Sequence, residues 1–509
     1  MAGSDDASST EKSTIAPSTE KPTMSPSQST MAVVALTGIS FLNTMGSGML
    51  TVALPHIATD VGLAQNILLW PASVYALAAG CTLLIFGSVA DVAGDKPVWL
   101  TGSILYTFFT LGCGLAQSAA QLIAFRTLLG ISIAMCLPSA VSLMTRTFGP
   151  GKMRNIGFAA MGMGQPLGYS VGLILGGVFA DSIGWRYGFY ISAILNGILC
   201  VLAFWCLPPL DLQSPKSILK GCLEIDWVGA IMISISLGLI SFVLAQLTNN
   251  YNSIGDAYII ALLVVSIVLL PAFAVWAGWR ERKNLPALIP NSLWKNSTFT
   301  STCIIVFFTW AVFNAFQYFS SLYFQNVQHH SALASSIRFI PMVVVGAATN
   351  IFTGFVVDKI QVRTLVFVSA IICLVPPLLM ALVKPEWGYW QGPFVAMLLS
   401  PLHPDAKLIY GTIYLVLFTV SNLIISQAYP GKNQSLAGAV FNSVSQVGNS
   451  VGLAVSAVVA ASVTDHSASH DLEKGYKAAF WMMFAAMIVV CIVSFFGLRS
   501  GGKVGKKSE

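Results

Sequence analysis

Charged residues are scarce in this chain of 509 residues, of which only 9% are Asp, Glu, Lys or Arg. Soluble domains carry roughly 25% charged residues, because a water-facing surface has to be covered by them. Hydrophobic residues make up 55% of the chain, and the mean hydropathy is +0.76. So little charge cannot cover a soluble protein of this length. The composition therefore predicts a polytopic membrane protein.

Patterns typical of enzymes and ATP-driven pumps are also lacking. No HExxH, DxD pair or histidine cluster lies near a membrane face, and no GxxxxGK[ST] nucleotide loop occurs. The GxSxG pattern matches only at 168–172 and 448–452, inside apolar windows and away from a membrane face. The nine cysteines show no CxxC spacing, so we interpret them as small hydrophobic residues and expect no metal site. The net charge of +6 is not gathered into a basic face, which argues against nucleic acid as a partner. We expect neither catalytic residues nor a cofactor.

Long apolar windows are abundant. A bilayer core needs about 20 apolar residues per helix, and the sequence offers fourteen such windows, which predicts an all-α fold with 14 transmembrane spans. They fall near residues 32–54, 68–90, 97–117, 120–145, 155–180, 187–208, 227–248, 257–279, 299–324, 335–357, 364–384, 408–427, 436–462 and 478–498.

The loops between these windows predict the orientation. An even number of spans puts both termini on one side, and most Lys and Arg residues of the short loops fall on that side. Cytoplasmic loops carry this excess, so both termini are expected in the cytoplasm. The N-terminal residues are rich in Ser, Thr and Pro and carry no secretory signal, which predicts a disordered tail.

Two short patterns recur in the same order. "GSVAD" (87–91) returns as "GFVVD" (354–358), and "GYSVGL" (168–173) returns as "GNSVGL" (448–453), with the extra residues of the second half expected within 385–415. Duplicated six-span halves are typical of transporters whose site lies between the halves. The predicted layout is two pseudo-repeated six-helix bundles joined by two linker helices. The expected segments are a tail at 1–31, bundles at 32–208 and 297–498, a linker at 209–296 with two additional spans, and a basic tail at 499–509.

Several motifs carry a family resemblance. The loop "GSVADVAGDK" (87–96) resembles the G-x-L-A-D-R-x-G-R-K signature of the major facilitator superfamily, with Val92 and Asp95 in place of its two arginines. "RTLLG" (126–130) resembles the R-x-x-x-G element of that family. Residues 168–177 resemble its antiporter element G-x-x-x-G-P-x-x-G-G, with Leu173 in place of proline. Together these motifs resemble the fourteen-span drug:proton antiporter branch. The stretches "LNTMGSGMLTVALP" (42–55) and "QSLAGAVFNSVSQVGNSVG" (434–452) resemble fungal efflux pumps most.

The resemblance implies roles for the polar residues of two motifs. It implies a cytoplasmic latch at Gly87, Asp91, Gly94 and Lys96, with Gly354 and Asp358 as the counterparts in the second half. Lys96 is expected to serve as the ion-pair partner in this loop. An ordinary polar turn is the alternative. It also implies that Arg126, a charge within an apolar span, acts in proton coupling or substrate binding. A charge there must face a cavity or a partner, unless it reaches the membrane surface.

A glycine stripe runs through the fifth window. Gly164, Gly168, Gly172 and Gly176 are spaced by four and Gly177 follows, so one face of the helix carries no side chains. Such a face lets another helix approach closely. Because Gly448 and Gly452 repeat the spacing, we expect both stripes where the two halves close against each other.

Polar residues within other windows are candidates for substrate contact. Uncharged amides with aromatic rings suit a large, mostly apolar, neutral ligand, although hydrogen bonds between helices would explain each of them equally well. The candidates are Asn43, Thr44, Gln165, Asn314, Gln317, Tyr318, Asn350, Asn442, Gln446 and Asn449. The middle of the spans contains no carboxylate, and Asn43 stands where many proteins of the branch have aspartate.

The resulting hypothesis is a monomeric multi-pass transporter in the lipid bilayer. It would export a small hydrophobic compound, such as a secondary metabolite, toxin or drug, by alternating access and proton antiport, with the proton gradient as energy source and no cofactor. The alternative is an uptake carrier of the same fold for a sugar, a siderophore or another small solute. The plasma membrane is the expected location, with a vacuolar or vesicle membrane as the alternative.

Overall fold

The computed structural model describes residues 25–64, 70–148, 152–208, 221, 223–249, 251–285, 287–346, 362–400, 434–467 and 471–497. The first six long helices are α1 (Pro26–Val61), α2 (Trp70–Ala93), α3 (Asp95–Leu115), α4 (Ala119–Thr147), α5 (Lys152–Asp181) and α6 (Trp185–Cys206). Two more, α8 (Trp227–Asn249) and α9 (Ala257–Arg282), occupy the predicted linker. The remainder comprises α10 (Ser297–Leu322), α11 (Ala332–Ile337), α13 (Val362–Cys373), α14 (Val375–Leu382), α15 (Pro393–Leu399), α17 (Gln434–His466) and α18 (Leu472–Gly497).

Eleven helices in the described part of the chain are long and apolar enough to cross a membrane. Shorter apolar helices at Leu333–Gly346 and Ala370–Leu382 cover parts of two further predicted windows. The window at 408–427 lies outside the described residues. An all-helical membrane protein is therefore confirmed, whereas the count of fourteen spans stays a prediction.

Helix α1 begins at Pro26, before the predicted start of the first span at residue 32. Ser25 caps the helix, because its hydroxyl accepts from the Gln28 backbone N–H and the Gln28 side chain accepts from the Ser25 backbone N–H. This reciprocal pair and the proline at the first helical position stabilise a helix start. The last six residues of the predicted tail, 26–31, are therefore part of α1.

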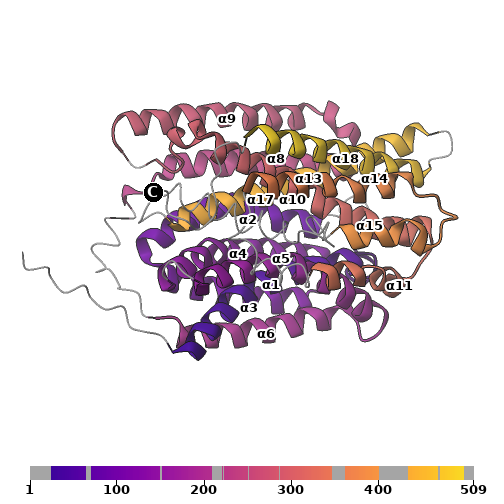
Figure 1. Ribbon diagram of the computed structural model, residues 1–509, viewed down its shortest axis with the longest axis horizontal. Coiled ribbons are helices and arrows are strands. Elements are labelled where there is room, and N and C mark those ends of the chain that lie inside the picture. Colours follow the sequence, from indigo (N-terminus) through magenta and orange to yellow (C-terminus); the bar gives the residue numbers. More distant parts are fainter. Residues whose placement is uncertain are drawn as a thin grey trace, which may run out of the picture.

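The long helices lie side by side in two groups (Figure 1). Helices α1 to α6 form one group, and α8, α9, α13, α14 and α18 lie on the opposite side of the molecule. Helix α17 runs between the groups, where it packs against α10 and α18 and also against α2, α4 and α8. This placement puts α17 at the interface between the two parts of the chain.

The predicted linker helices pack onto the bundle. In α8, the Ser234 hydroxyl donates to the backbone oxygen of Cys81 in α2. At the start of α8, the buried Asp226 accepts from the indole N–H of Trp276 at 2.9 Å and lies 3.7 Å from Arg280, both in α9. These contacts hold α8 and α9 together and place α8 against α2, next to the central cavity described below.

Candidate functional site

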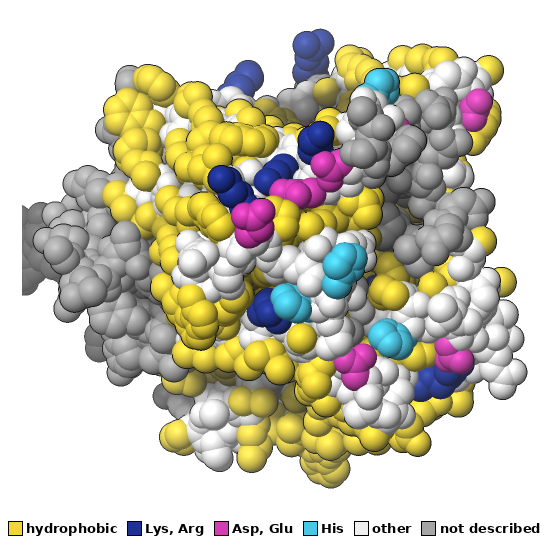
Figure 2. All heavy atoms as spheres, turned by 90° about the vertical axis from the view of Figure 1, so that its right-hand side faces the viewer, with side chains coloured by type: hydrophobic (Ala, Val, Ile, Leu, Met, Phe, Trp, Pro, Cys, Tyr) yellow, Lys and Arg dark blue, Asp and Glu magenta, His cyan; other side chains and the backbone are white. Residues whose placement is uncertain are grey.

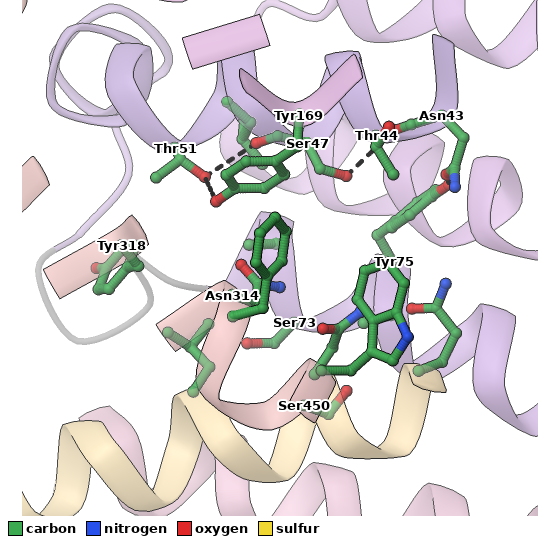
Figure 3. A pocket seen from close by; sticks show the side chains of 18 of the residues that line it. Asn43, Thr44, Ser47, Thr51, Ser73, Tyr75, Tyr169, Asn314, Tyr318 and Ser450 are labelled. Carbon is green, nitrogen blue, oxygen red and sulfur yellow. Dashed lines mark hydrogen bonds between the residues drawn. The ribbon is translucent and has the colours of Figure 1, made fainter. Parts of the chain in front are cut away.

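A cavity of about 100 Å³ lies in the middle of the bundle. Its walls come from α1, α2, α4 and α5 on one side, from α10 and α17 on the other, and from Ser241 of α8. Figure 3 shows the polar side chains of these helices pointing toward one another around this space. The cavity is therefore built by both parts of the chain together.

Helix α1 lines the cavity with a polar row. Asn43, Ser47 and Thr51 follow one another at a spacing of four, which places them on one helix face (Figure 3). The Thr51 hydroxyl donates to the Ser47 backbone oxygen at 2.9 Å and lies 3.0 Å from the Tyr169 hydroxyl of α5. These bonds fix the side chains that a small solute would meet on this wall.

Arg126 of α4 is the one basic residue among the lining residues. It is 2% exposed, and its Nε donates to the Pro71 backbone oxygen of α2 at 3.0 Å. Its guanidinium carbon lies 4.3 Å from the ring centre of Tyr75, also in α2, which is the geometry of a cation–π contact. The Tyr75 hydroxyl in turn donates to the side-chain oxygen of Asn43.

The wall from the second half is partly aromatic. Phe313 of α10 lies 5.8 Å from Trp310 and 6.4 Å from Tyr169 of α5, measured between ring centres. Asn449 of α17 also lines the cavity, and its buried side-chain oxygen has no hydrogen-bond partner among the described residues. The cavity thus combines an apolar wall with polar groups that remain available to a ligand.

The structure brings most of the predicted contact residues to this cavity. Asn43, Thr44, Gln165, Asn314, Tyr318, Gln446 and Asn449 line it. Gln317 does not, because its amide donates back to the Phe313 backbone oxygen at 3.4 Å and the residue is fully buried. Asn442 is buried one helical turn before Gln446, beyond the lining residues of α17. Asn350 lies outside the described residues.

Sequence reasoning missed several lining residues. The missed polar or aromatic residues include Ser47, Thr51, Ser73, Tyr75, Tyr169, Ser241, Trp310 and Ser450. The polar row of α1 had a detectable signal, because hydroxyl residues at a spacing of four after Asn43 mark one face of an apolar helix. Ser241 had no such signal, since its helix was interpreted as a linker.

The predicted latch is an ion pair within the first group of helices. Arg146 of α4 contacts Asp91 of α2 at 3.3 Å and Asp95, the first residue of α3, at 3.2 Å. Asp95 is fully buried and also accepts from the Ser142 hydroxyl at 2.6 Å. Gly94 links α2 to α3 with φ +99°, a conformation that favours glycine. The cation of the latch thus comes from α4.

Lys96 does not pair with these carboxylates, which corrects its expected role as their ion-pair partner. Its ammonium donates to the backbone oxygens of Phe204 and Leu207 at the end of α6. Consecutive helical residues point about 100° apart, so a helix that turns Asp95 toward α4 turns Lys96 away from it. Gly87 is buried in α2, and the counterparts Gly354 and Asp358 lie outside the described residues.

The glycine stripe of α5 lies against α1. A Cβ atom at Gly164 would meet the Thr37 backbone oxygen at 3.2 Å, and one at Gly176 would meet that of Met49 at 2.7 Å. At Gly168 and Gly172 a Cβ would collide with the backbone oxygens of α1 more severely. Gly177 is buried beside them. The two backbones are therefore in direct contact along four helical turns.

The second stripe makes the same contact in the second half. A Cβ at Gly448 or Gly452 of α17 would collide with the backbone oxygen of Phe307 or Ala311 in α10. The prediction that the stripes face each other between the halves is therefore wrong for this structure. Each stripe binds a helix of its own half, because the matching backbone groove lies on α1 or α10.

The end of the bundle where α1 ends is predicted to face outward. Figure 2 shows histidine and charged side chains gathered on this end. His56 lies 3.7 Å from Asp181, which also accepts from the backbone N–H of Leu333 in α11. One helical turn deeper, the Ser336 hydroxyl donates to the Leu173 backbone oxygen at 2.8 Å. These bonds join α5 of the first half to α11 of the second.

Comparison with known proteins identifies relatives along nearly the whole chain. A family model described as Major Facilitator Superfamily matches residues 36–452. MFS-type transporter 1 of Pyricularia oryzae is 51% identical over 94% of this chain and 85% of its own. An efflux pump of Aspergillus terreus is 25% identical over 92% of this chain and 88% of its own. A low affinity ammonium transporter of Saccharomyces cerevisiae is also 25% identical, over 81% of this chain and 77% of its own.

A solved structure shares the fold. The crystal structure of the human organic anion transporter MFSD10 superposes with a TM-score of 0.60. The match covers 92% of this chain and 97% of the other, at 14% sequence identity. At this identity the similarity supports the helical architecture alone.

Proposed function

The chain belongs to the major facilitator superfamily, whose members are membrane transporters and not enzymes, and on this premise we propose that it exports a small organic compound by alternating access. The central cavity carries this proposal. Its walls come from helices of both halves, so a movement of one half against the other would change which side of the membrane the cavity faces. The similarity to an efflux pump supports the direction of transport.

The cavity is the proposed substrate site. A volume of about 100 Å³ is below the range of 300–1,000 Å³ typical of pockets for drug-sized ligands. A small solute fits this conformation, and a larger one requires the halves to move apart. We propose that a single chain carries out transport as a monomer.

Opening toward the predicted outer side would break specific contacts. The bonds from Leu333 to Asp181 and from Ser336 to Leu173 join the halves at that end. The latch of Arg146 with Asp91 and Asp95 lies at the opposite end, within the first half. In our proposal the α5–α11 bonds break when the cavity opens outward, and the latch holds α2, α3 and α4 together as they move.

The proton gradient is the proposed energy source, by proton antiport. The lining residues include no carboxylate and no histidine, so coupling would involve carboxylates at the ends of the bundle. Asp181 beside His56 and Asp95 beside Arg146 are the candidates. We propose the plasma membrane as the location, with both termini cytoplasmic.

Uptake of a small solute is the second candidate function. The similarity to an ammonium transporter favours it, because that relative is as similar to this chain as the efflux pump is. The glycine stripe of α5, which resembles the antiporter element, favours export.

Accumulation in cells tests the proposal. Yeast cells that lack their own efflux pumps would be loaded with labelled small toxins and compared with and without this protein. Export predicts lower accumulation with the protein, and a protonophore should abolish the difference. Ala76→Trp, which fills the cavity, should abolish it too, whereas Leu195→Trp on the exposed face of α6 should not. Equal accumulation of every toxin would contradict export, and higher accumulation with the protein would indicate uptake.

A further inference from the structure

The central cavity contains a single charged side chain, and no counterion contacts it among the residues that the structure describes. Among the lining residues, Arg126 is the one that carries a charge at neutral pH, and it is 2% exposed. An arginine cannot lose its proton in a protein. A buried charge without a partner is costly in a membrane. Some other species must therefore compensate Arg126 while the protein works.

The contacts of Arg126 leave part of the guanidinium available. Its Nε is occupied by the Pro71 backbone oxygen at 3.0 Å, and one face of the group rests on the Tyr75 ring at 4.3 Å. In the described residues no acceptor binds its two terminal nitrogens. These contacts fix the orientation of the guanidinium without neutralising it. The fixed group presents two parallel N–H donors, which suits a carboxylate.

The carboxylates of the neighbouring helices bind other partners at the two ends of the bundle. Asp91 and Asp95 contact Arg146 at the predicted cytoplasmic end. Asp60 pairs with Arg186 at the opposite end, and Asp181 accepts from Leu333 there. No Asp or Glu stands in the middle of a predicted span anywhere in the sequence. Among the described residues, therefore, no carboxylate side chain serves as the counterion of Arg126.

Asn43 is the neutral neighbour of the Tyr75 ring on which Arg126 rests. It accepts a hydrogen bond from the Tyr75 hydroxyl, on the same ring that carries Arg126. An aspartate at this position would place a negative charge at the hydroxyl end of the Tyr75 ring, whose face contacts Arg126, within the same cavity wall. The sequence has the neutral amide instead, so the site keeps its positive charge.

We propose that the transported substrate is a small organic monoanion whose carboxylate binds Arg126. The inference rests on the proposed transport function and names the substrate class of the same cavity. The rings of Trp310, Phe313 and Tyr169 form an apolar wall for the rest of the molecule. The cavity volume of about 100 Å³ limits the substrate in this conformation to a few carbon atoms or one aromatic ring.

Binding of matched probes to the purified full-length protein tests the proposal. Benzoate and benzamide have nearly the same shape and differ in charge. Phenylacetate and phenylacetamide form a second such pair. We expect each carboxylate to bind at least about tenfold more tightly than its amide, because only the anion neutralises Arg126. Equal binding of the two members, or no binding of either carboxylate, would overturn the inference.

Three variants assign the preference to Arg126. Arg126→Gln should abolish it, and Arg126→Lys should retain part of it, because lysine keeps the charge but loses the two parallel donors. Asn43→Asp should weaken benzoate binding at least about tenfold by supplying an internal counterion. Elution as a single monodisperse species shows that each variant is folded. A carboxylate preference that persists in both Arg126→Gln and Asn43→Asp would contradict the role of Arg126.

The two proposals fail in different ways. If cells with and without the protein accumulate every compound equally, the transport proposal fails, whatever the binding data show. If cells with the protein export benzamide or another neutral compound and the Arg126→Gln variant exports it equally well, transport stands and the anion proposal fails.

Discussion

The two halves of the chain use the same backbone contact to different extents. In the first half, glycines at four successive turns of α5 lie against backbone oxygens of α1. In the second half, two glycines of α17 lie against α10. Helix α17 also carries the cavity residues Gln446, Asn449 and Ser450 and packs against α2 and α4 of the first half.

The different lengths of the two contacts indicate different roles for the two helix pairs. Helices α1 and α5 form a continuous pair within one half, since the contact runs along the whole stripe. Helix α17 holds α10 over a shorter length, because its other faces meet the cavity and the opposite half. We therefore expect the first half to move as a rigid unit and the second half to tolerate small shifts of α17.

The largest expected effect is that of Gly172→Leu in the first half. Even a Cβ atom at Gly172 would collide with the Met45 backbone oxygen, so a leucine must force α1 and α5 apart. We expect membrane insertion to persist and transport to fall to less than about a tenth, since overpacking shifts the backbone. Gly255→Leu is the control, because a Cβ at Gly255 meets nothing within 4 Å. Normal transport by Gly172→Leu would show that the α1–α5 contact is dispensable.

Gly452→Ala tests the shorter contact in the second half. Its Cβ would collide with backbone atoms of Ala311, and a methyl group in a full contact costs about 1–3 kcal/mol of stability. Gly46→Ala should be neutral or slightly stabilising, because nothing lies within 4 Å of its Cβ. Thermal unfolding of both purified variants measures the difference. If Gly452→Ala destabilises the protein more than Gly172→Ala, the proposed contrast between the halves is reversed.

The latch motif also differs between the two halves in the charge of its residues. The first half has two latch carboxylates, whereas Val362 stands in the second half at the position that corresponds to Asp95. Asp95→Asn should lower the unfolding free energy by about 1–3 kcal/mol, because the buried carboxylate binds both Arg146 and Ser142. Asp91→Asn should cost less, since the side chain of Asp91 is 11% exposed and that of Asp95 is fully buried. Equal thermal stability of the two variants would contradict this order.

The smallest expected effect concerns pH at the predicted outer end. Burial, together with the nearby Arg338, lowers the pKa of His330 below its usual 6.5. The unfolded chain therefore binds more protons than the folded one just below pH 6.5. The folded segment around His330, between α10 and α11, loses stability as the pH falls through this range. Because His330 is only partly buried, we expect less than about a twofold change in the opening of the α10–α11 connection.

Hydrogen exchange between pH 7 and pH 5.5 measures this opening. His330→Gln should remove the pH dependence there. The Asp60–Arg186 pair, in the first half at the same end, should show none in this range, because the hydrogen bond from Arg186 holds the pKa of Asp60 below its usual value of 3.8. A pH dependence that His330→Gln leaves unchanged would assign the effect to another group.

Local patterns in the sequence were enough to predict most of the architecture. Eleven of the expected spans appear as long apolar helices in the described residues, because hydropathy and span length are properties of one segment. The same holds for the amides at Asn43, Asn314 and Gln446, which stand out within apolar windows and do line the cavity. Gln317 stands out equally but bonds to its own helix, which its position does not reveal.

What the sequence determined by itself is a membrane protein with glycine stripes, a charge in the fourth span and a paired carboxylate motif. Composition and periodicity encode these features because each depends on residues close together in the chain. Only the tertiary structure decided that the stripe of α5 faces α1, that Arg146 replaces Lys96 as the partner of Asp91, and that Ser241 of α8 reaches the cavity. Each of these depends on which helices become neighbours, and that is determined by packing between segments far apart in the sequence.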